Sequence, residues 1–216
     1  LLRSKQNEIS DQIEASWIEC DHAILIANDL ALACYASVMS RKIHEAYEAF
    51  PAHSHHRAAI HADFVKGLLL VEHSLKRGLY GQAATLLRRE IEAVNNCYAH
   101  RLSKQKDKKN PHVKPYKHIE AIYNQLSGIA HTSDRDLMSY LSGGAPANSD
   151  PRFDKELVEH FLQTHIHCLI GMALDLSFER QYSAQTYLDP SEEKYATEVL
   201  AVLTMTGFLT LAPATG

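Results

Sequence analysis

The chain has 216 residues, of which 45% are hydrophobic, and a formal net charge of −4 at pH 7. This length allows one domain or at most two small ones, and only 9 glycines and 7 prolines argue against a turn-rich β fold. The negative net charge excludes a surface that is basic throughout and would bind any nucleic acid.

Residues 6–48 are predicted to form a long helix with one break at most. Small and apolar residues recur in it at alternating spacings of three and four, which places them on one seam. The seam consists of Trp17, Cys20, Ile24, Ala27, Ala31, Cys34 and Val38. A helix of this length is typical of a protruding or dimerising element, so we expect a homodimer formed through it.

A second helix is expected over about residues 57–77, after a short solvated loop at 53–56 that is rich in histidine. Its middle, Leu68 to Val71, is apolar on nearly all sides, which is typical of a helix in the centre of a bundle. Gly78 is the expected C-cap.

Two further helices are predicted over about residues 82–101 and 116–130. If they pack as antiparallel neighbours, six polar residues on their flanks converge on a small cleft. These are Arg88, Glu92, Asn95, Tyr123, Ser127 and His131. The planar guanidinium of Arg88 suits phosphate or carboxylate, and His131 is a candidate general acid or base near neutral pH.

The simpler interpretation of the same residues is structural. Arg88 and Glu92 are four residues apart and form an ordinary helix pair, and His131 lies at the end of its helix, where the dipole favours a cation. Structural and functional polar networks look alike in a sequence, so residue types alone favour this interpretation.

A basic segment, residues 101–118, connects these two helices. It holds seven basic residues against Asp107, a local charge of +6, so the rest of the chain carries −10. Four of its lysines are predicted to bind substrate: Lys104, Lys106, Lys108 and Lys109. Such a segment suits phosphate contacts, although charge runs are commonly just solvated loops.

The C-terminal part is predicted to contain a short helix at 135–141, a long helix starting at Pro151 after an Asp150 N-cap, and a last helix starting at Asp189-Pro190. No stretch shows sustained period-two alternation. The sequence therefore predicts one all-α domain, residues 1–216, built as a bundle of six or seven helices with a long N-terminal helix. Mobile loops are expected at about 102–115 and 142–150, and the motif-bearing core at about 57–141.

The four cysteines form no C-x-x-C pair, and we interpret them as small buried hydrophobes in a reducing cytosol. They are Cys20, Cys34, Cys97 and Cys168. Glu19 and His22 have the Glu-x-x-His spacing of di-iron bundles, but no second copy of the motif occurs. We therefore expect a cytoplasmic protein with no metal, no cofactor and no membrane association.

Two motifs carry a resemblance. LLR-x-x-x-E-A at Leu86 to Ala93 and Y-x-x-LS-x-x-x-H at Tyr123 to His131 resemble a bacterial family of helical domains of unknown function, often found in phage-defence settings. The resemblance covers roughly residues 60–140. It implies that the functional residues are Arg88, Glu92, Ser127 and His131.

A looser likeness is to the HEPN superfamily, whose members are helical, often dimeric bundles and in many cases metal-independent ribonucleases. Their signature is an arginine and a histidine on one helix with four to six residues between them. This chain departs from it, since two residues separate Arg41 from His44 and three separate Arg57 from His61. HEPN-like catalysis here would take its arginine and histidine from different helices.

Two functional hypotheses follow. The first is an RNA-binding protein or HEPN-like metal-independent ribonuclease or toxin in a defence setting, in which Arg88 binds phosphate, His131 transfers a proton, and Asn95, Tyr123 and the basic segment hold the strand. The second is a non-catalytic homodimeric helical interaction module with a further protein partner. The first requires Arg88 and His131 to face one solvent-reachable pocket near residues 101–118.

Overall fold

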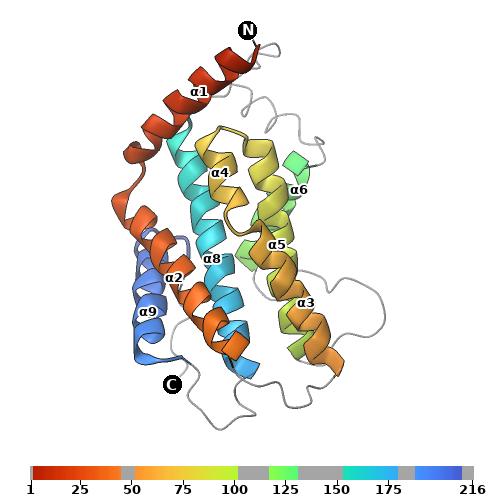
Figure 1. Ribbon diagram of the computed structural model, residues 1–216. Coiled ribbons are helices and arrows are strands. Elements are labelled where there is room, and N and C mark those ends of the chain that lie inside the picture. Colours follow the sequence, from red (N-terminus) through yellow and green to blue (C-terminus); the bar gives the residue numbers. More distant parts are fainter. Residues whose placement is uncertain (1, 45–51, 102–116, 131–152, 180–187, 211–216) are drawn as a thin grey trace. The chain divides into compact units, whose positions relative to one another are not determined.

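The computed structural model describes residues 2–44, 52–101, 117–130, 153–179 and 188–210 (Figure 1). Every regular element in these ranges is a helix and none is a strand, which confirms the predicted all-α fold. The chain groups into two compact units. Unit 1 comprises Leu1–Cys20 and Phe50–Phe161, and unit 2 comprises Asp21–Ala49 and Leu162–Gly216. That residues 1–216 form a single domain stays a prediction.

The long N-terminal helix is broken once, as predicted. Helix α1 (Leu2–Ser16) leads into the short 3-10 helix η1 (Trp17–Glu19), and α2 (His22–His44) begins after it. The backbone N–H of Ala23 donates to Asp21 Oδ1 at 2.8 Å. This side-chain cap satisfies the N–H of Ala23, which has no partner within the helix, and so stabilises the start of a new helix at this position.

In unit 2, α2 packs along α9 (Pro190–Met205). The predicted seam residues Ala27, Ala31, Cys34 and Val38 are all fully buried. Small side chains let the two helices approach closely, and the thiol of Cys34 reaches the backbone oxygen of Glu192 at 3.7 Å. The seam that we expected to form a dimer interface is thus covered within the chain. The homodimer itself stays a prediction.

Helix α9 begins at the predicted residues, with a complete capping box. The side chain of Asp189 accepts hydrogen bonds from the backbone N–H groups of Ser191 and Glu192, both at 3.0 Å. In return, Glu192 Oε2 accepts from the N–H of Asp189 at 3.1 Å. The other oxygen of the fully buried Glu192 accepts from Ser37 Oγ at 2.8 Å. One carboxylate therefore caps α9 and joins it to α2.

Within α2, His22–Ser40 is long and apolar enough to cross a membrane, with a mean hydropathy of 1.6. A core helix of a water-soluble protein and a signal sequence both pass the same test. In the structure α2 packs along α9 with its seam buried, and 39% of the apolar window is buried. The cytoplasmic location stays a prediction.

In unit 1, α5 packs against three other helices, α3, α4 and α6, and so forms the centre of the unit (Figure 1). The bounds are α3 Ala52–Gly67, α4 Leu70–Lys76, α5 Tyr80–Arg101 and α6 Lys117–Ala130. Helix α8 (Lys155–Glu179) starts in unit 1, and the boundary between the units falls after its residue Phe161.

The prediction of one helix over residues 57–77 in the centre of the bundle was wrong. The chain forms two helices with a break at Leu68–Leu69, and the first already starts at Ala52, so it includes the whole of the expected loop at 53–56. Leu69 is 64% and Leu70 is 48% exposed, whereas His61, Phe64 and Leu75 are buried. The buried residues of a helix are three or four positions apart and lie on one face. Four consecutive apolar residues point in different directions around the helix, so they cannot all lie on that face.

Gly78 has the predicted capping role. Its φ of 66° lies in the left-handed region that glycine adopts without a steric penalty. Its N–H bonds to Leu75 O at 3.0 Å and the N–H of Leu79 bonds to Ser74 O at 2.8 Å. These bonds satisfy carbonyls at the end of α4 and turn the chain directly into α5.

Helix α8 starts at Lys155, four residues after the predicted Pro151. The capping residue is Asp154, whose Oδ1 accepts from the N–H of Leu157 at 3.1 Å, so Asp150 is not the N-cap. The predicted helix at 135–141 and the loops at 102–115 and 142–150 lie outside the described residues. All four cysteines are free and buried, as predicted.

Candidate functional site

The predicted polar site centres on α5 and α6, which pack against each other in unit 1. On α6, Ile122, Leu126 and Ile129 are buried and form an apolar stripe. Tyr123 is the next residue after the buried Ile122, so its side chain lies beside this stripe, where it reaches the flank of α5. Arg88 and Glu92 lie one turn apart on that flank.

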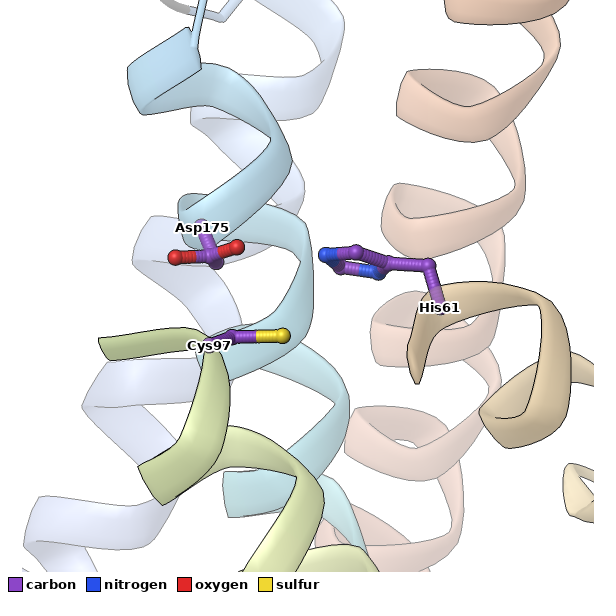
Figure 2. A group of neighbouring side chains, drawn as sticks. All are labelled: His61, Cys97 and Asp175. Atoms are coloured by element: carbon purple, nitrogen blue, oxygen red, sulfur yellow. The ribbon is translucent and has the colours of Figure 1, made fainter. Parts of the chain in front are cut away.

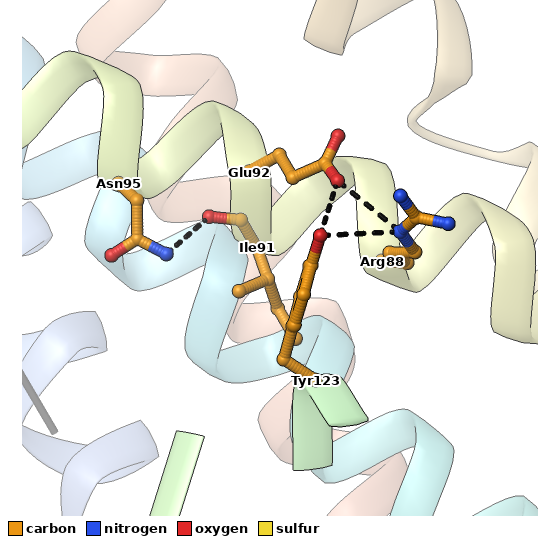
Figure 3. Close-up of polar contacts among 5 residues, drawn as sticks. All are labelled: Arg88, Ile91, Glu92, Asn95 and Tyr123. Atoms are coloured by element: carbon orange, nitrogen blue, oxygen red, sulfur yellow. Dashed lines mark hydrogen bonds and ion pairs between the residues drawn. The ribbon is translucent and has the colours of Figure 1, made fainter. Parts of the chain in front are cut away.

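Three of the six predicted residues come together there, as Figure 3 shows. The hydroxyl of Tyr123 donates to Glu92 Oε1 at 2.7 Å. Arg88 Nε donates to the same carboxylate oxygen at 3.2 Å and to Tyr123 Oη at 3.3 Å. The guanidinium carbon also lies 5.5 Å from the centre of the Tyr123 ring, within cation–π range. We call these residues the Arg88–Glu92–Tyr123 cluster.

The cluster is accessible to solvent. The side chains of Arg88 and Glu92 are 26% and 29% exposed. The hydrogen bond to Tyr123 is the main cause of a raised pKa for Arg88, and the charges of Tyr123 and Glu92 act in the same direction. Arg88 is therefore a permanent cation. Its two contacts in the cluster use Nε, and the terminal nitrogens extend on the side away from the tyrosine hydroxyl (Figure 3).

The structure places two other predicted residues differently. Asn95 is 8% exposed, and its Nδ2 donates to the backbone oxygen of Ile91 at 2.9 Å, so its amide turns onto its own helix (Figure 3). The hydroxyl of Ser127 is buried and has no hydrogen-bond partner among the described residues. Neither side chain joins the cluster.

The remaining predicted site residues lie outside the described residues. They are His131, Lys104, Lys106, Lys108 and Lys109. Arg101 ends α5 thirteen residues after Arg88, and Lys117 begins α6 six residues before Tyr123. At 1.5 Å per residue, the two ends of the basic segment attach about 20 Å and about 9 Å along the helices from the cluster.

A second feature of unit 1 was missed in the sequence. A cavity of about 450 Å³ lies between α3, α4 and α5, and Glu92 lines it together with Asp63, Arg89 and the buried Glu90. Arg89 Nη2 pairs with Asp63 Oδ2 at 3.0 Å, which joins α5 to α3. The one available signal was that Glu90 lies on the apolar side of its helix, which is unusual for a glutamate.

Unit 1 also contains a buried histidine beside a buried cysteine. His61 on α3 and Cys97 on α5 are 3% and 0% exposed, and their candidate ligand atoms lie within 4.8 Å of each other (Figure 2). Zinc sites take three or four protein ligands, so this pair alone does not make a metal centre. Asp175, also drawn in Figure 2, belongs to unit 2 and is a buried residue of α8.

Comparisons with protein-family models, with curated proteins and with solved structures found no match. The resemblance to a helical defence-associated family and the looser HEPN likeness therefore stay expectations from the motifs alone. What the residues and geometry define is an all-α protein with an arginine, a glutamate and a tyrosine clustered between two packed helices.

Proposed function

We propose that the protein binds RNA, through the basic segment 101–118 and the Arg88–Glu92–Tyr123 cluster. The observation that carries the proposal is the position of Arg88. A partly exposed, permanent cation is held by Glu92 and Tyr123 on the two helices that the basic segment connects. A fixed guanidinium is well suited to a phosphate because its planar fork needs little further ordering.

The spacing supports an extended strand as the ligand. The cluster and the ends of the basic segment attach about 10–20 Å apart along the helices, a span of a few nucleotides. Binding at several such points would release counterions and fall steeply with salt. The defence setting and the toxin role rest on the resemblance of the two motifs.

Cleavage of the bound strand is a finer part of the same proposal. A metal-independent ribonuclease needs a general base and a general acid near the phosphate. The candidates for these two roles are the Glu92 carboxylate and His131. The resemblance implies Arg88 and Ser127 as the other two functional residues. Cleavage that persists in EDTA and is lost in His131→Ala would support this step. RNA binding without cleavage would limit the proposal to recognition.

The direct test of binding is fluorescence anisotropy with a labelled single-stranded RNA across a salt series. We expect Lys104→Gln/Lys106→Gln/Lys108→Gln/Lys109→Gln to bind more weakly and to lower the slope of log K against log salt by up to about 2.8, at about 0.7 per lost phosphate contact. The control is Lys155→Gln/Lys194→Gln, which removes two exposed lysines elsewhere. If each lost lysine weakened RNA binding by the same amount in both variants, the basic segment would not be a specific RNA site.

The alternative is a non-catalytic homodimeric interaction module with a further protein partner. One observation favours it: the Tyr123 hydroxyl both donates and accepts within the cluster, as in a purely structural network. This alternative predicts a dimer and no RNA binding. Sedimentation equilibrium of the same preparation measures the first, and the anisotropy assay measures the second.

A further inference from the structure

The cavity between α3, α4 and α5 has the size of a ligand site. Its volume is about 450 Å³, and small-molecule pockets typically measure roughly 300–1,000 Å³. It shares Glu92 with the Arg88–Glu92–Tyr123 cluster, but Arg88 and Tyr123 do not line it. The cavity is therefore a separate candidate site that the proposed RNA binding does not use.

Apolar side chains from all three helices form much of its wall. They are Ile60 and Phe64 on α3, Leu70 on α4 and Leu86 on α5. Phe64 is 6% exposed, whereas Leu70 is 48% exposed, so the wall runs from the core of the unit out to its surface. An apolar body bound there would remove the exposed part of this wall from water, which favours binding.

The charged groups at the cavity balance one another. Three carboxylates line it, and three cations either line it or pair with a lining residue: Asp63, Glu90 and Glu92, with Lys66, Arg88 and Arg89. Asp63 pairs with Arg89 at 3.0 Å, and Glu92 accepts from Arg88 at 3.2 Å. Glu90, which is 7% exposed, also interacts within the protein. A charged head group would lose its hydration there and meet both signs of charge, so the lining favours an uncharged ligand.

One uncharged polar side chain, that of Asn96 on α5, also lines the cavity and is half-buried. It forms no hydrogen bond with a residue in the described part of the chain. An asparagine amide offers both donors and an acceptor. Ligand pockets are typically apolar with a few polar groups that fix the orientation of the ligand, and Asn96 is suited to this role.

We propose that this cavity binds a small uncharged molecule with an aromatic body and a hydroxyl group, such as an aryl alcohol. Its ring packs on Phe64, Leu70 and Leu86, where a second aromatic ring gains a favourable contact with the ring of Phe64. Its hydroxyl bonds to the amide of Asn96. The inference is independent of the proposed RNA binding.

The test uses three probes with the same ring and different head groups: 2-phenylethanol, 2-phenylethylamine and phenylacetate. Each is titrated up to 10 mM into the ¹⁵N-labelled full chain, and amide shifts are followed by NMR. We expect 2-phenylethanol to bind at least tenfold more tightly than either ion. Its shifts should fall on residues 59–70 of α3 and α4 and residues 86–96 of α5.

Two glycine variants locate the site. A Cβ atom at Gly67 or at Gly81 would meet no described atom within 4 Å outside its own helix backbone, so neither change should disturb the fold. Gly67 lines the cavity, and Gly81 does not. Gly67→Leu should therefore occupy the cavity and weaken 2-phenylethanol at least tenfold, whereas Gly81→Leu should leave its affinity unchanged. Equal affinities of the two folded variants would place the ligand elsewhere and overturn the proposal.

Asn96→Ala tests the polar contact. It should weaken 2-phenylethanol about fivefold, the value of one net hydrogen bond, and leave ethylbenzene, titrated up to 1 mM, unchanged. An equal effect on both probes would contradict a hydrogen bond from Asn96.

The head groups give the remaining outcomes. If either ion binds as tightly as 2-phenylethanol, the cavity does not select an uncharged ligand. If no probe shifts the amides of α3, α4 and α5 at 10 mM, the cavity is not a site for this class of ligand. Since no RNA is present, neither result bears on the proposed RNA binding.

Discussion

The hydroxyl of Tyr123 and the carboxylate of Glu92 are joined by a hydrogen bond of 2.7 Å that links α6 to α5. Arg88 completes the contact by donating Nε to both groups. The groups that hold the guanidinium in place therefore also hold the two helices together. For this reason, each variant of the cluster has to be measured for stability as well as for the proposed RNA binding.

Tyr123→Phe removes the hydroxyl and leaves the ring in place. The hydroxyl takes part in two hydrogen bonds, with Glu92 and with Arg88, and we expect their loss at this partly exposed site to lower the free energy of unfolding by about 1–2 kcal/mol. Urea denaturation followed by circular dichroism measures it. Tyr195→Phe on α9 is the matched control, because Tyr195 forms no hydrogen bond with a described residue. Equal stability of the two variants would mean that these bonds contribute nothing.

Glu192 and Glu193 are neighbours in the first turn of α9, but only Glu192 is buried. Glu192→Ala removes the acceptor for Ser37 Oγ and for the N–H of Asp189. We expect a loss of about 2–3 kcal/mol, because two half-buried donors lose their acceptor and the capping box is broken. Glu193→Ala should change the free energy of unfolding by less than about 0.5 kcal/mol. Similar losses would show that the α2–α9 contact does not depend on Glu192.

Burial raises the pKa of the Cys20 thiol from 9.0 to about 11, with a smaller contribution from the charge of Glu159. The folded chain therefore keeps this proton at a pH where the unfolded chain releases it. The resulting stability is fully present below pH 9 and is lost as the pH rises toward 11. Between pH 8 and 10 we expect the wild type to lose about 1 kcal/mol more than Cys20→Ala. Superimposable pH profiles of unfolding free energy would contradict the raised pKa.

Trp17 is the chain's one tryptophan and reports on the packing of η1 in unit 1. Lys76 Nζ lies 5.0 Å from the centre of its ring and also pairs with Glu72 at 2.6 Å. Lys76→Met should lower the stability seen by tryptophan fluorescence by about 0.5–1 kcal/mol through the lost cation–π contact. Glu72→Gln breaks the ion pair but keeps the cation, and should have a smaller effect. Equal losses in the two variants would assign the stabilisation to the ion pair, because Lys76→Met breaks both contacts and Glu72→Gln breaks only the ion pair.

Local patterns predicted the helices well, because amphipathic periodicity and caps are encoded within a few residues. Gly78 and Asp189 have the expected capping roles, and the helices around Arg88 and Tyr123 lie within two residues of their predicted bounds. The break at Leu68–Leu69 was not predicted because four consecutive apolar residues show no period that would mark it.

The site was predicted only in part, for two physical reasons. Asn95 shares the flank of Arg88 and Glu92, but its amide bonds to its own backbone at Ile91, a local competition that spacing does not show. The cavity is lined from three helices, so its existence depends on their packing. Asp63 and Arg89 are 26 residues apart, and no sequence pattern predicts their ion pair.

The measurement that tests the proposed RNA binding most directly compares two adjacent arginines. Arg88→Gln removes the cation of the cluster, whereas Arg89→Gln removes a neighbouring cation of equal charge that pairs with Asp63. Anisotropy with a labelled single-stranded RNA at fixed salt should show about tenfold weaker binding for Arg88→Gln, the value of one charge-assisted hydrogen bond, and near wild-type binding for Arg89→Gln. Equal affinities of both folded variants would contradict a role of the cluster in RNA binding.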